Sequence, residues 1–259
     1  MQGSWRAPAY TPWACMSTAP LSYNRAAQPR RAAEAGRLER ERLMIDDRPH
    51  TTLALIRHAQ ARAADGSYGA ATPLSELGRR QAAAMVGTLS QRPRPAAVYT
   101  SPFPRAVQTA APLCRAYAIA PLIDPRLAEY ELGYGALAAA VVERLDLLLW
   151  RPEHQGVAGG ERLGAFAARI AAFCDEVVAR HVGDWVAVFT HSGTIDAALR
   201  WAVGLPAESC WQHEFNLATA SITELAVWPS GRVPGGAPRY TAIRRVGDVR
   251  HLGALVANV

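Results

Sequence analysis

Short, continuously apolar segments alternate along this chain with longer segments of helical periodicity. Three of the apolar segments are brief enough for strands and almost free of polar residues, namely Thr52–Ile56, Ala96–Tyr99 and Trp185–Phe189. Strands of that composition are buried on both faces, as in parallel sheets that helices cover on both sides. The alternation therefore predicts an α/β fold, a three-layer sandwich with a mostly parallel sheet between two layers of helices.

The remaining elements follow from periodicity and from helix-capping residues. We expect helices over Glu76–Leu89, Arg105–Tyr117, Leu137–Leu149, Glu161–His181 and Gly193–Val203, and strands over Leu122–Ile123, Ser221–Val227 and Tyr240–Arg244. Ser75 stands at the N-cap position of the first helix. In the long helix that begins at Glu161, large apolar residues recur on one side, which predicts that this helix packs against the sheet.

The first 50 residues differ in composition from the rest. They are rich in proline, and no acidic residue precedes Glu34. No apolar core follows a basic start, so the segment does not resemble a secretory signal. We expect 1–50 to be a disordered or non-native extension, with Met44 as a candidate initiator and 1–43 dispensable; an Arg-rich transit peptide is the alternative. We expect one domain over 51–259, with an irregular insertion at 126–160.

The basic residues of this chain are all of one kind. All 28 are arginine, and the chain contains no lysine. A Walker-A phosphate loop and a Schiff-base lysine are therefore excluded. An anion site must be built from arginine, histidine and backbone N–H groups, and the arginine fork binds phosphate with two hydrogen bonds.

The charge distribution, the hydropathy and the cysteines exclude other classes. The net charge is +6, but no arginine cluster is interleaved with aromatic residues, so a nucleic-acid partner is not expected. No apolar run approaches the ~20 residues that cross a membrane, so no membrane association is expected either. The four cysteines are scattered without metal-site spacing, which predicts reduced thiols in a cytoplasmic protein. No oligomeric state is predicted.

Basic residues follow three of the predicted strands. Arg57 and His58 end the first strand, Arg105 opens the helix after the second, and His191 follows the third. Ligands of open α/β sheets bind beyond the carboxyl ends of the strands. Two guanidinium groups and two imidazoles near helix N-termini therefore predict a phosphate-binding pocket.

The segments around these residues resemble the histidine phosphatase superfamily, also called the phosphoglycerate mutase-like family. The resemblance covers about residues 52–252 in the family's order. The motifs that carry it are LIRHAQ, SPFPRAVQTA, LAEYELG, GGE, FTHSGTI and FNLATASITEL. Six ordered motifs are far more specific than an isolated Arg-His pair.

The resemblance implies roles for four basic residues. His58 would be the nucleophile, attacking phosphorus and becoming phosphohistidine. Arg57, Arg105 and His191 would bind the phosphoryl oxygens and offset charge in the transition state. Because arginine would supply this neutralisation, neither a metal nor a cofactor is expected, and the sequence carries no metal-ligand cluster.

The resemblance also implies an acid. Glu129 would protonate the leaving alcohol and then activate the hydrolytic water. It stands two residues after Leu127 and four before Gly133, as the family pattern requires. Glu131 is the nearby rival for this role.

Three positions depart from the family pattern. Ala59 replaces the glycine that follows the nucleophile, so a methyl group stands where close backbone approach is usual. Gln60 replaces the more common glutamate. Ala64 stands where an asparagine is frequent, which removes one expected phosphate donor.

The function predicted from these features is metal-independent hydrolysis of a small phosphorylated metabolite, with 51–259 as the catalytic domain and 126–160 over the pocket. Phosphoglycerate mutase-type transfer is the first alternative, but mutases carry a lysine and paired arginines in the insertion. This chain has only separated arginines there and no lysine. A non-catalytic phosphate-dependent interaction module is the second alternative. The small-molecule phosphomonoester itself is not specified by any motif.

Overall fold

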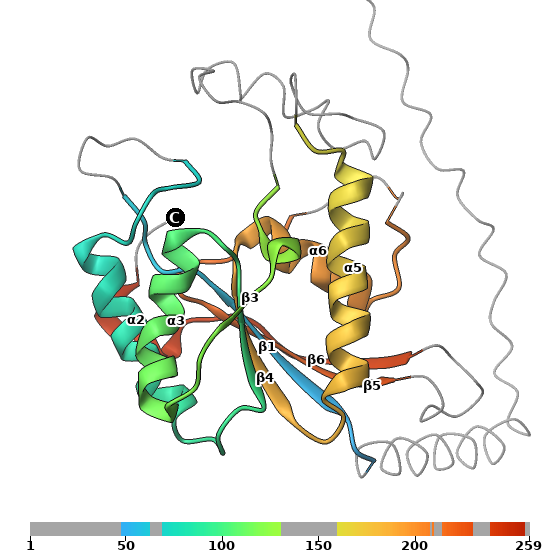
Figure 1. The fold of residues 1–259 in the computed structure, drawn as a ribbon, viewed down its shortest axis with the longest axis horizontal. Helices are drawn as coiled ribbons and strands as arrows, with labels where there is room; N and C mark the ends of the chain where they lie inside the picture. Colours follow the sequence, from blue (N-terminus) through green and yellow to red (C-terminus); the bar gives the residue numbers. More distant parts are fainter. Residues whose placement is uncertain are drawn as a thin grey trace, which may run out of the picture. The chain divides into compact units, whose positions relative to one another are not determined.

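The computed structural model describes residues 48–62, 69–130, 160–207, 209, 214–229 and 239–256. Six strands form a sheet in the order β3-β2-β4-β1-β5-β6 (Figure 1). Their bounds are β1 Thr51–Arg57, β2 Ala97–Thr100, β3 Leu122–Ile123, β4 Trp185–Thr190, β5 Ile222–Pro229 and β6 Arg239–Asp248.

Strand direction agrees with the predicted sheet. β1, β2, β3 and β4 run parallel to one another. β5 is antiparallel to both of its neighbours, β1 and β6. The mostly parallel sheet is therefore confirmed, with one reversed strand that returns the chain from the carboxyl ends of β1 and β4.

Helices cover both faces of the sheet. α2 (Glu76–Leu89) and α3 (Pro104–Tyr117) lie on one face, and α5 (Leu163–Arg180) and α6 (Ser192–Ala202) lie on the other (Figure 1). Successive residues of a strand point to opposite faces. Thus Leu53 and Leu55 join the apolar cluster under α5 and α6, whereas Ala54 and Ile56 join the cluster under α2 and α3. The three-layer sandwich is confirmed.

The helix bounds differ from the expected ones by a few residues. α2 has the predicted bounds, and Ser75 caps it by accepting a hydrogen bond from the Gly78 amide at 3.0 Å. α3 begins one residue early, at Pro104, because proline suits the first helical position. α5 begins two residues later than expected, which leaves Glu161 before the helix. The helix expected over Leu137–Leu149 lies outside the described residues, as does most of 1–50.

Two 3₁₀ segments were not expected from the sequence. η2 (Pro125–Leu127) leads from β3 toward Glu129, and η4 (Arg250–Leu255) follows β6. Both are too short to carry a helical periodicity that a sequence pattern could reveal.

α5 shows how the buried and exposed sides of a helix divide. Phe166 and Phe173 are fully buried, whereas Glu176 and Arg180 form an outward ion pair at 2.6 Å.

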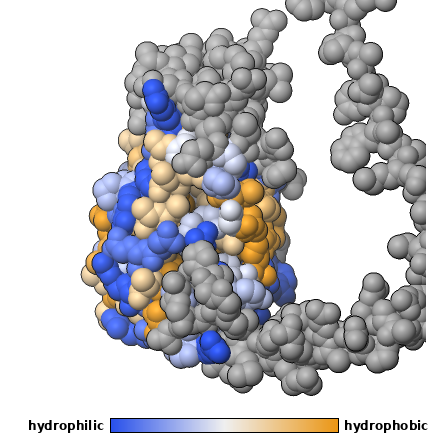
Figure 2. Space-filling model, turned by 90° about the vertical axis from the view of Figure 1, so that its right-hand side faces the viewer, coloured by the Kyte–Doolittle hydropathy of each residue, from blue (hydrophilic) through white to orange (hydrophobic). Residues whose placement is uncertain are grey.

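Hydrophilic and hydrophobic residues lie side by side on the face of the molecule shown in Figure 2. No helix within the described ranges has the length and hydrophobicity to cross a membrane.

Candidate active site

The sheet register brings the two predicted histidines together. Arg57 of β1 pairs with Thr190 of β4, so the residues that follow, His58 and His191, leave neighbouring strands at the same level. The His58 amide donates to the Thr190 carbonyl at 2.8 Å, which extends the ladder by one residue. The two imidazole rings meet edge to face, with centroids 5.1 Å apart.

His58 is held in one tautomer. Its Nδ1 lies 2.8 Å from the Ala59 carbonyl oxygen, which can only accept, so Nδ1 carries the proton. Burial lowers the pKa of His58 to about 3; the bond to Ala59 opposes this shift, and the charges of Arg105 and Arg57 add to it. At neutral pH the ring is therefore uncharged, and Nε2 keeps the lone pair that a nucleophile needs.

His191 is fully buried beside His58. Its Nε2 lies 2.8 Å from the hydroxyl of Ser101, the residue that follows β2. Burial holds the pKa of His191 well below its usual range, and His58, Arg105 and Arg57 lower it further. Its Nδ1 is buried without a hydrogen-bond partner in the described part of the chain, which is unusual for a buried polar atom.

Backbone carbonyl groups orient the two predicted phosphate-binding arginines. The guanidinium of Arg57 donates to the Leu217 carbonyl. Arg105, only 3% exposed, donates to the Gly69 carbonyl at 2.8 Å and lies 4.9 Å from the Phe103 ring centroid. A carbonyl oxygen fixes the direction of a guanidinium without cancelling its charge.

Glu129 lies at the N-terminus of α6. Its Oε2 accepts from the Gly193 amide at 3.2 Å, and its Oε1 accepts from the Tyr130 amide at 2.9 Å. Burial raises the pKa of the Glu129 carboxyl, while both hydrogen bonds and the charges of Arg105 and Arg57 oppose that rise. A carboxyl whose pKa is raised retains its proton to higher pH, as a general acid must.

Two residues in the site were not singled out from the sequence. Ser101 contacts His191, and its position directly after a buried strand was the available signal. Gly193 has no side chain because a Cβ at this position would lie 2.6 Å from Oε1 of Glu129. Its signal was its place two residues after His191 in the FTHSGTI motif.

Two of the three positions that depart from the family pattern lie among the described residues and make structural contacts. The side chain of Ala59 is fully buried in the apolar cluster under α2 and α3. The Gln60 side chain accepts from the Ser75 hydroxyl at 2.7 Å at the start of α2. Ala64 and the rival acid Glu131 lie outside the described residues.

Within the described ranges, no group of three or more histidine, cysteine, aspartate or glutamate side chains is arranged to hold a metal ion.

The structure describes five predicted site residues, and they come from four separate segments. They are Arg57, His58, Arg105, Glu129 and His191. They lie together near the carboxyl ends of β1, β2 and β4, the edge at which the sequence placed the two arginines and the two histidines.

Known proteins share this architecture. A structure titled as mycobacterial glucosyl-3-phosphoglycerate phosphatase with inorganic phosphate aligns with a TM-score of 0.62 at 27% identity, covering 80% of this chain and 99% of that chain. A structure titled Mycobacterial hydrolase 2 aligns with a TM-score of 0.63 at 26% identity, over 76% and 90% of the two chains.

Curated relatives agree with the structural matches. Glucosyl-3-phosphoglycerate phosphatase of Mycolicibacterium vanbaalenii is 31% identical over 80% of this chain and 96% of its own length. Phosphoserine phosphatase 1 of Hydrogenobacter thermophilus is 30% identical over 67% of this chain and 86% of its own length.

Family membership follows from the extent of these matches. A bifunctional protein of Mycobacterium tuberculosis is 31% identical over 67% of this chain but only 50% of its own length, so this chain spans about half of that relative. The profile of the histidine phosphatase superfamily (branch 1) matches residues 53–234. The chain belongs to the histidine phosphatase superfamily.

Proposed function

We propose that this protein is a metal-independent phosphomonoester hydrolase that works through a phosphohistidine on His58. The observation that carries the proposal is the state of His58, a neutral imidazole whose Nδ1–H is bound to the Ala59 carbonyl, so that the lone pair of the ring is on Nε2. The two arginines and His191 surround this nucleophile with groups that bind phosphoryl oxygens.

In the first step, Nε2 of His58 attacks phosphorus and the bond from phosphorus to the ester oxygen breaks. Glu129, whose pKa is raised by burial, acts as the general acid: it transfers a proton to the departing oxygen, which leaves as the alcohol. The products of this step are phosphohistidine and the Glu129 carboxylate. Arg57 and Arg105 stabilise the charge that spreads over the phosphoryl oxygens during transfer.

In the second step, the Glu129 carboxylate takes a proton from water while the water oxygen attacks phosphorus. The bond from phosphorus to nitrogen breaks and its electron pair returns to Nε2 of His58, so neutral His58 and protonated Glu129 are both regenerated. The Nδ1 of His191 contacts the phosphoryl group in both steps, which supplies the missing partner of that buried atom.

The substrate class that we propose is a small phosphorylated metabolite. Two relatives aligned over most of their own length are named for glucosyl-3-phosphoglycerate and for phosphoserine. Their substrates share a phosphomonoester on a small polar acid. We also propose a cytoplasmic location, which the scattered cysteines support, since Cys114 and Cys174 are free and buried.

Trapping the intermediate tests the mechanism. We expect the parent protein, quenched in base during turnover, to carry up to one phosphate per chain on His58, in a form stable to base and labile to acid. His58→Ala should remove both this label and the activity, lowering kcat by roughly 10⁴-fold or more.

His181→Asn is the matched control, because His181 caps the far end of α5 and bonds to the Tyr99 hydroxyl at 2.9 Å. It should keep full labelling and turnover, and chelators should leave the parent activity intact. Normal turnover by His58→Ala would refute the proposal. Transfer of the label to a second phosphate ester rather than to water would favour the mutase alternative.

A further inference from the structure

Arg169 of α5 contacts the segment that carries Glu129. Its Nη1 donates to the Ala128 carbonyl at 2.9 Å and also to the Arg126 carbonyl, and its Nη2 lies 3.4 Å from the Glu129 carbonyl oxygen. One guanidinium therefore contacts three carbonyl groups of four successive residues.

Glu161 holds this guanidinium in place. Its two carboxylate oxygens accept from Nε and Nη2 of Arg169 at 2.7 and 2.8 Å, and both side chains are about four-fifths buried. This bidentate geometry fixes the plane of the fork. The Arg169 guanidinium also lies 4.6 Å from the ring centroid of Phe166, against which Tyr130 packs at 5.3 Å.

Two threonine hydroxyls donate further hydrogen bonds to the carbonyl groups of the segment from Arg126 to Glu129. The Leu127 carbonyl accepts from the Thr190 hydroxyl at 2.7 Å, and the Ala128 carbonyl accepts from the Thr194 hydroxyl at 3.3 Å. Ala128 is extended, beyond the end of η2, so no helical or sheet ladder determines its conformation. Side chains from three elements supply the hydrogen bonds that a ladder would otherwise supply.

We propose, on the basis of the function proposed above, that Arg169 held by Glu161 is a positioning residue that aligns the Glu129 carboxyl for proton transfer. A rotation of this backbone would move the carboxyl away from the Gly193 amide and from the leaving oxygen. Proton transfer depends on heavy-atom distances near 3 Å, so a displacement of ~1 Å costs up to about 10²-fold in rate.

Arginine suits this position better than lysine does. The guanidinium presents five N–H donors in one plane, so it can bind a carboxylate along one edge and carbonyl oxygens along another. A lysine ammonium has three donors on a flexible stem and cannot keep both edges engaged. Arg169→Lys therefore removes the positioning function while keeping the charge and most of the side-chain volume.

The test compares two leaving groups in the full-length protein. For Arg169→Lys and Arg169→Gln we expect kcat on an alkyl phosphate to fall about 10–100-fold with KM nearly unchanged. The rate of phosphohistidine formation from nitrophenyl phosphate should change far less, because nitrophenolate leaves without a proton. Arg180→Gln is the control, since Arg180 lies on the same helix and pairs with Glu176 at the surface.

A double-mutant cycle shows whether Arg169 acts through Glu129. In a Glu129→Gln background, Arg169→Lys should have almost no further effect on the alkyl phosphate. The pH dependence of kcat is a second measure. In Arg169→Lys, the apparent pKa that describes loss of the Glu129 proton should differ from that of the parent protein.

Three outcomes would overturn the proposal: additive effects in the cycle, equal losses on both leaving groups, or a change confined to KM, which would make Arg169 a substrate-binding residue. Thermal melting verifies that each variant is folded. If Arg169→Gln is unfolded, Arg169→Lys carries the same test. If the parent forms no phosphohistidine, the proposed function fails first. If the parent turns over normally and the Arg169 variants match it, only the positioning role fails.

Discussion

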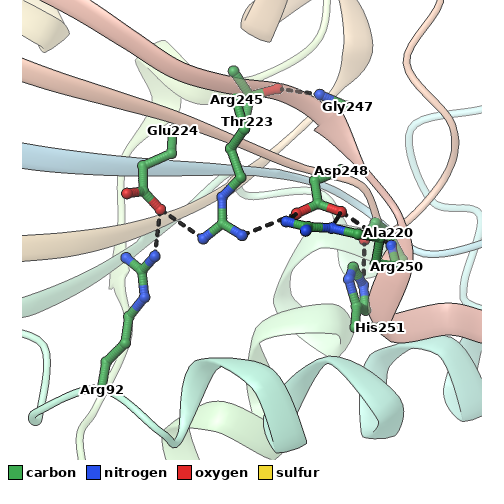
Figure 3. A network of polar contacts seen from close by, with 9 residues as sticks. All are labelled: Arg92, Ala220, Thr223, Glu224, Arg245, Gly247, Asp248, Arg250 and His251. Atoms are coloured by element: carbon green, nitrogen blue, oxygen red, sulfur yellow. Dashed lines mark hydrogen bonds and ion pairs between the residues drawn. The ribbon is translucent and has the colours of Figure 1, made fainter.

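Two clusters of charged residues in this molecule differ in the groups on which their arginines act. In the ion-pair network of β5, β6 and η4, Glu224 accepts from Arg92 and from Arg245 at 2.7 Å (Figure 3). Asp248 accepts from Arg245 at 3.0 Å and from Arg250 at 2.7 Å (Figure 3). Each charge in this network contacts an opposite charge, and the network ties both late strands to the chain after α2.

The active site uses arginine differently. The contacts described above direct the guanidinium groups of Arg57 and Arg105 with backbone carbonyl oxygens, and both charges lower the pKa values of His58 and His191. In the network, by contrast, hydrogen bonds from Arg250 lower the pKa of Asp248. Ion pairs between side chains stabilise a fold, whereas guanidinium groups beside two neutral imidazoles act on the pKa values of these rings and can act on a bound anion.

The largest difference between the two regions is expected from replacing one carboxylate in each. In the proposed mechanism Glu129→Gln removes the proton donor, so kcat on an alkyl phosphate should fall ~10²–10⁴-fold. On nitrophenyl phosphate, hydrolysis of phosphohistidine should become the slow step, and stopped-flow absorbance should show a burst of about one nitrophenol per site. Glu224→Gln should leave both rates unchanged. If Glu131→Gln gives the burst and Glu129→Gln does not, the acid is two residues further on.

Replacing one arginine in each region gives the next largest contrast. Arg105→Gln should lower kcat on either ester ~10²–10³-fold, the usual cost of one charge-stabilising donor. Vanadate inhibition should weaken with it, because the same group binds the oxyanion. Arg245→Gln should retain the parent kcat and vanadate inhibition while lowering the melting temperature. An equal loss of kcat in both variants would contradict the division into structural and functional charge.

We expect the free energy of unfolding to depend on the ion-pair network more than on the active site. Glu224→Gln removes a carboxylate that both Arg92 and Arg245 contact, in a region where Glu224 is only 15% exposed. The free energy of unfolding should fall by about 1–3 kcal/mol in urea titrations. Glu76→Gln is the control, because its pair with Arg79 is 77% exposed on the glutamate side and should contribute almost nothing.

Lowering the pH should reduce the contributions of the two regions to stability in different pH ranges. This is the smallest of the expected effects. His58 has a pKa of about 3 in the folded protein against 6.5 for the free side chain, so the unfolded chain binds more protons between these values. Stability therefore falls as pH drops below about 6.5, by about 1 kcal/mol per pH unit for each buried histidine. His58→Asn should flatten this slope in urea titrations between pH 7 and 5. Burial acts to raise the pKa of Glu224, but hydrogen bonds from Arg245 and Arg92 lower it below its usual value. The stabilisation that Glu224 gives is therefore complete above pH ~4.5 and is lost only as the pH falls below that value. An unchanged slope in His58→Asn would mean that the folded protein already carries a protonated His58.

Much of this molecule follows from its sequence. Apolar runs and helical periodicity are local properties, so they located β1, β4 and α2 to within one residue. The carboxyl ends of parallel strands share one edge of a sheet, so the positions of His58 and His191 predicted that they meet. The motif spacing placed Glu129 in the same site, where the charges of Arg105 and Arg57 act on its carboxyl.

The tertiary structure decided what depends on residues far apart in the chain. Glu129 and Gly193 are 64 positions apart, and Arg169 lies 41 positions from Ala128, so no local pattern reveals either contact. The tautomer of His58 follows from the path of its own backbone, which brings Nδ1 to the Ala59 carbonyl. The sequence thus determined which reactive groups are present and which strands end at them. Packing determined their protonation and their orientation, because these properties depend on burial and distance in the folded chain.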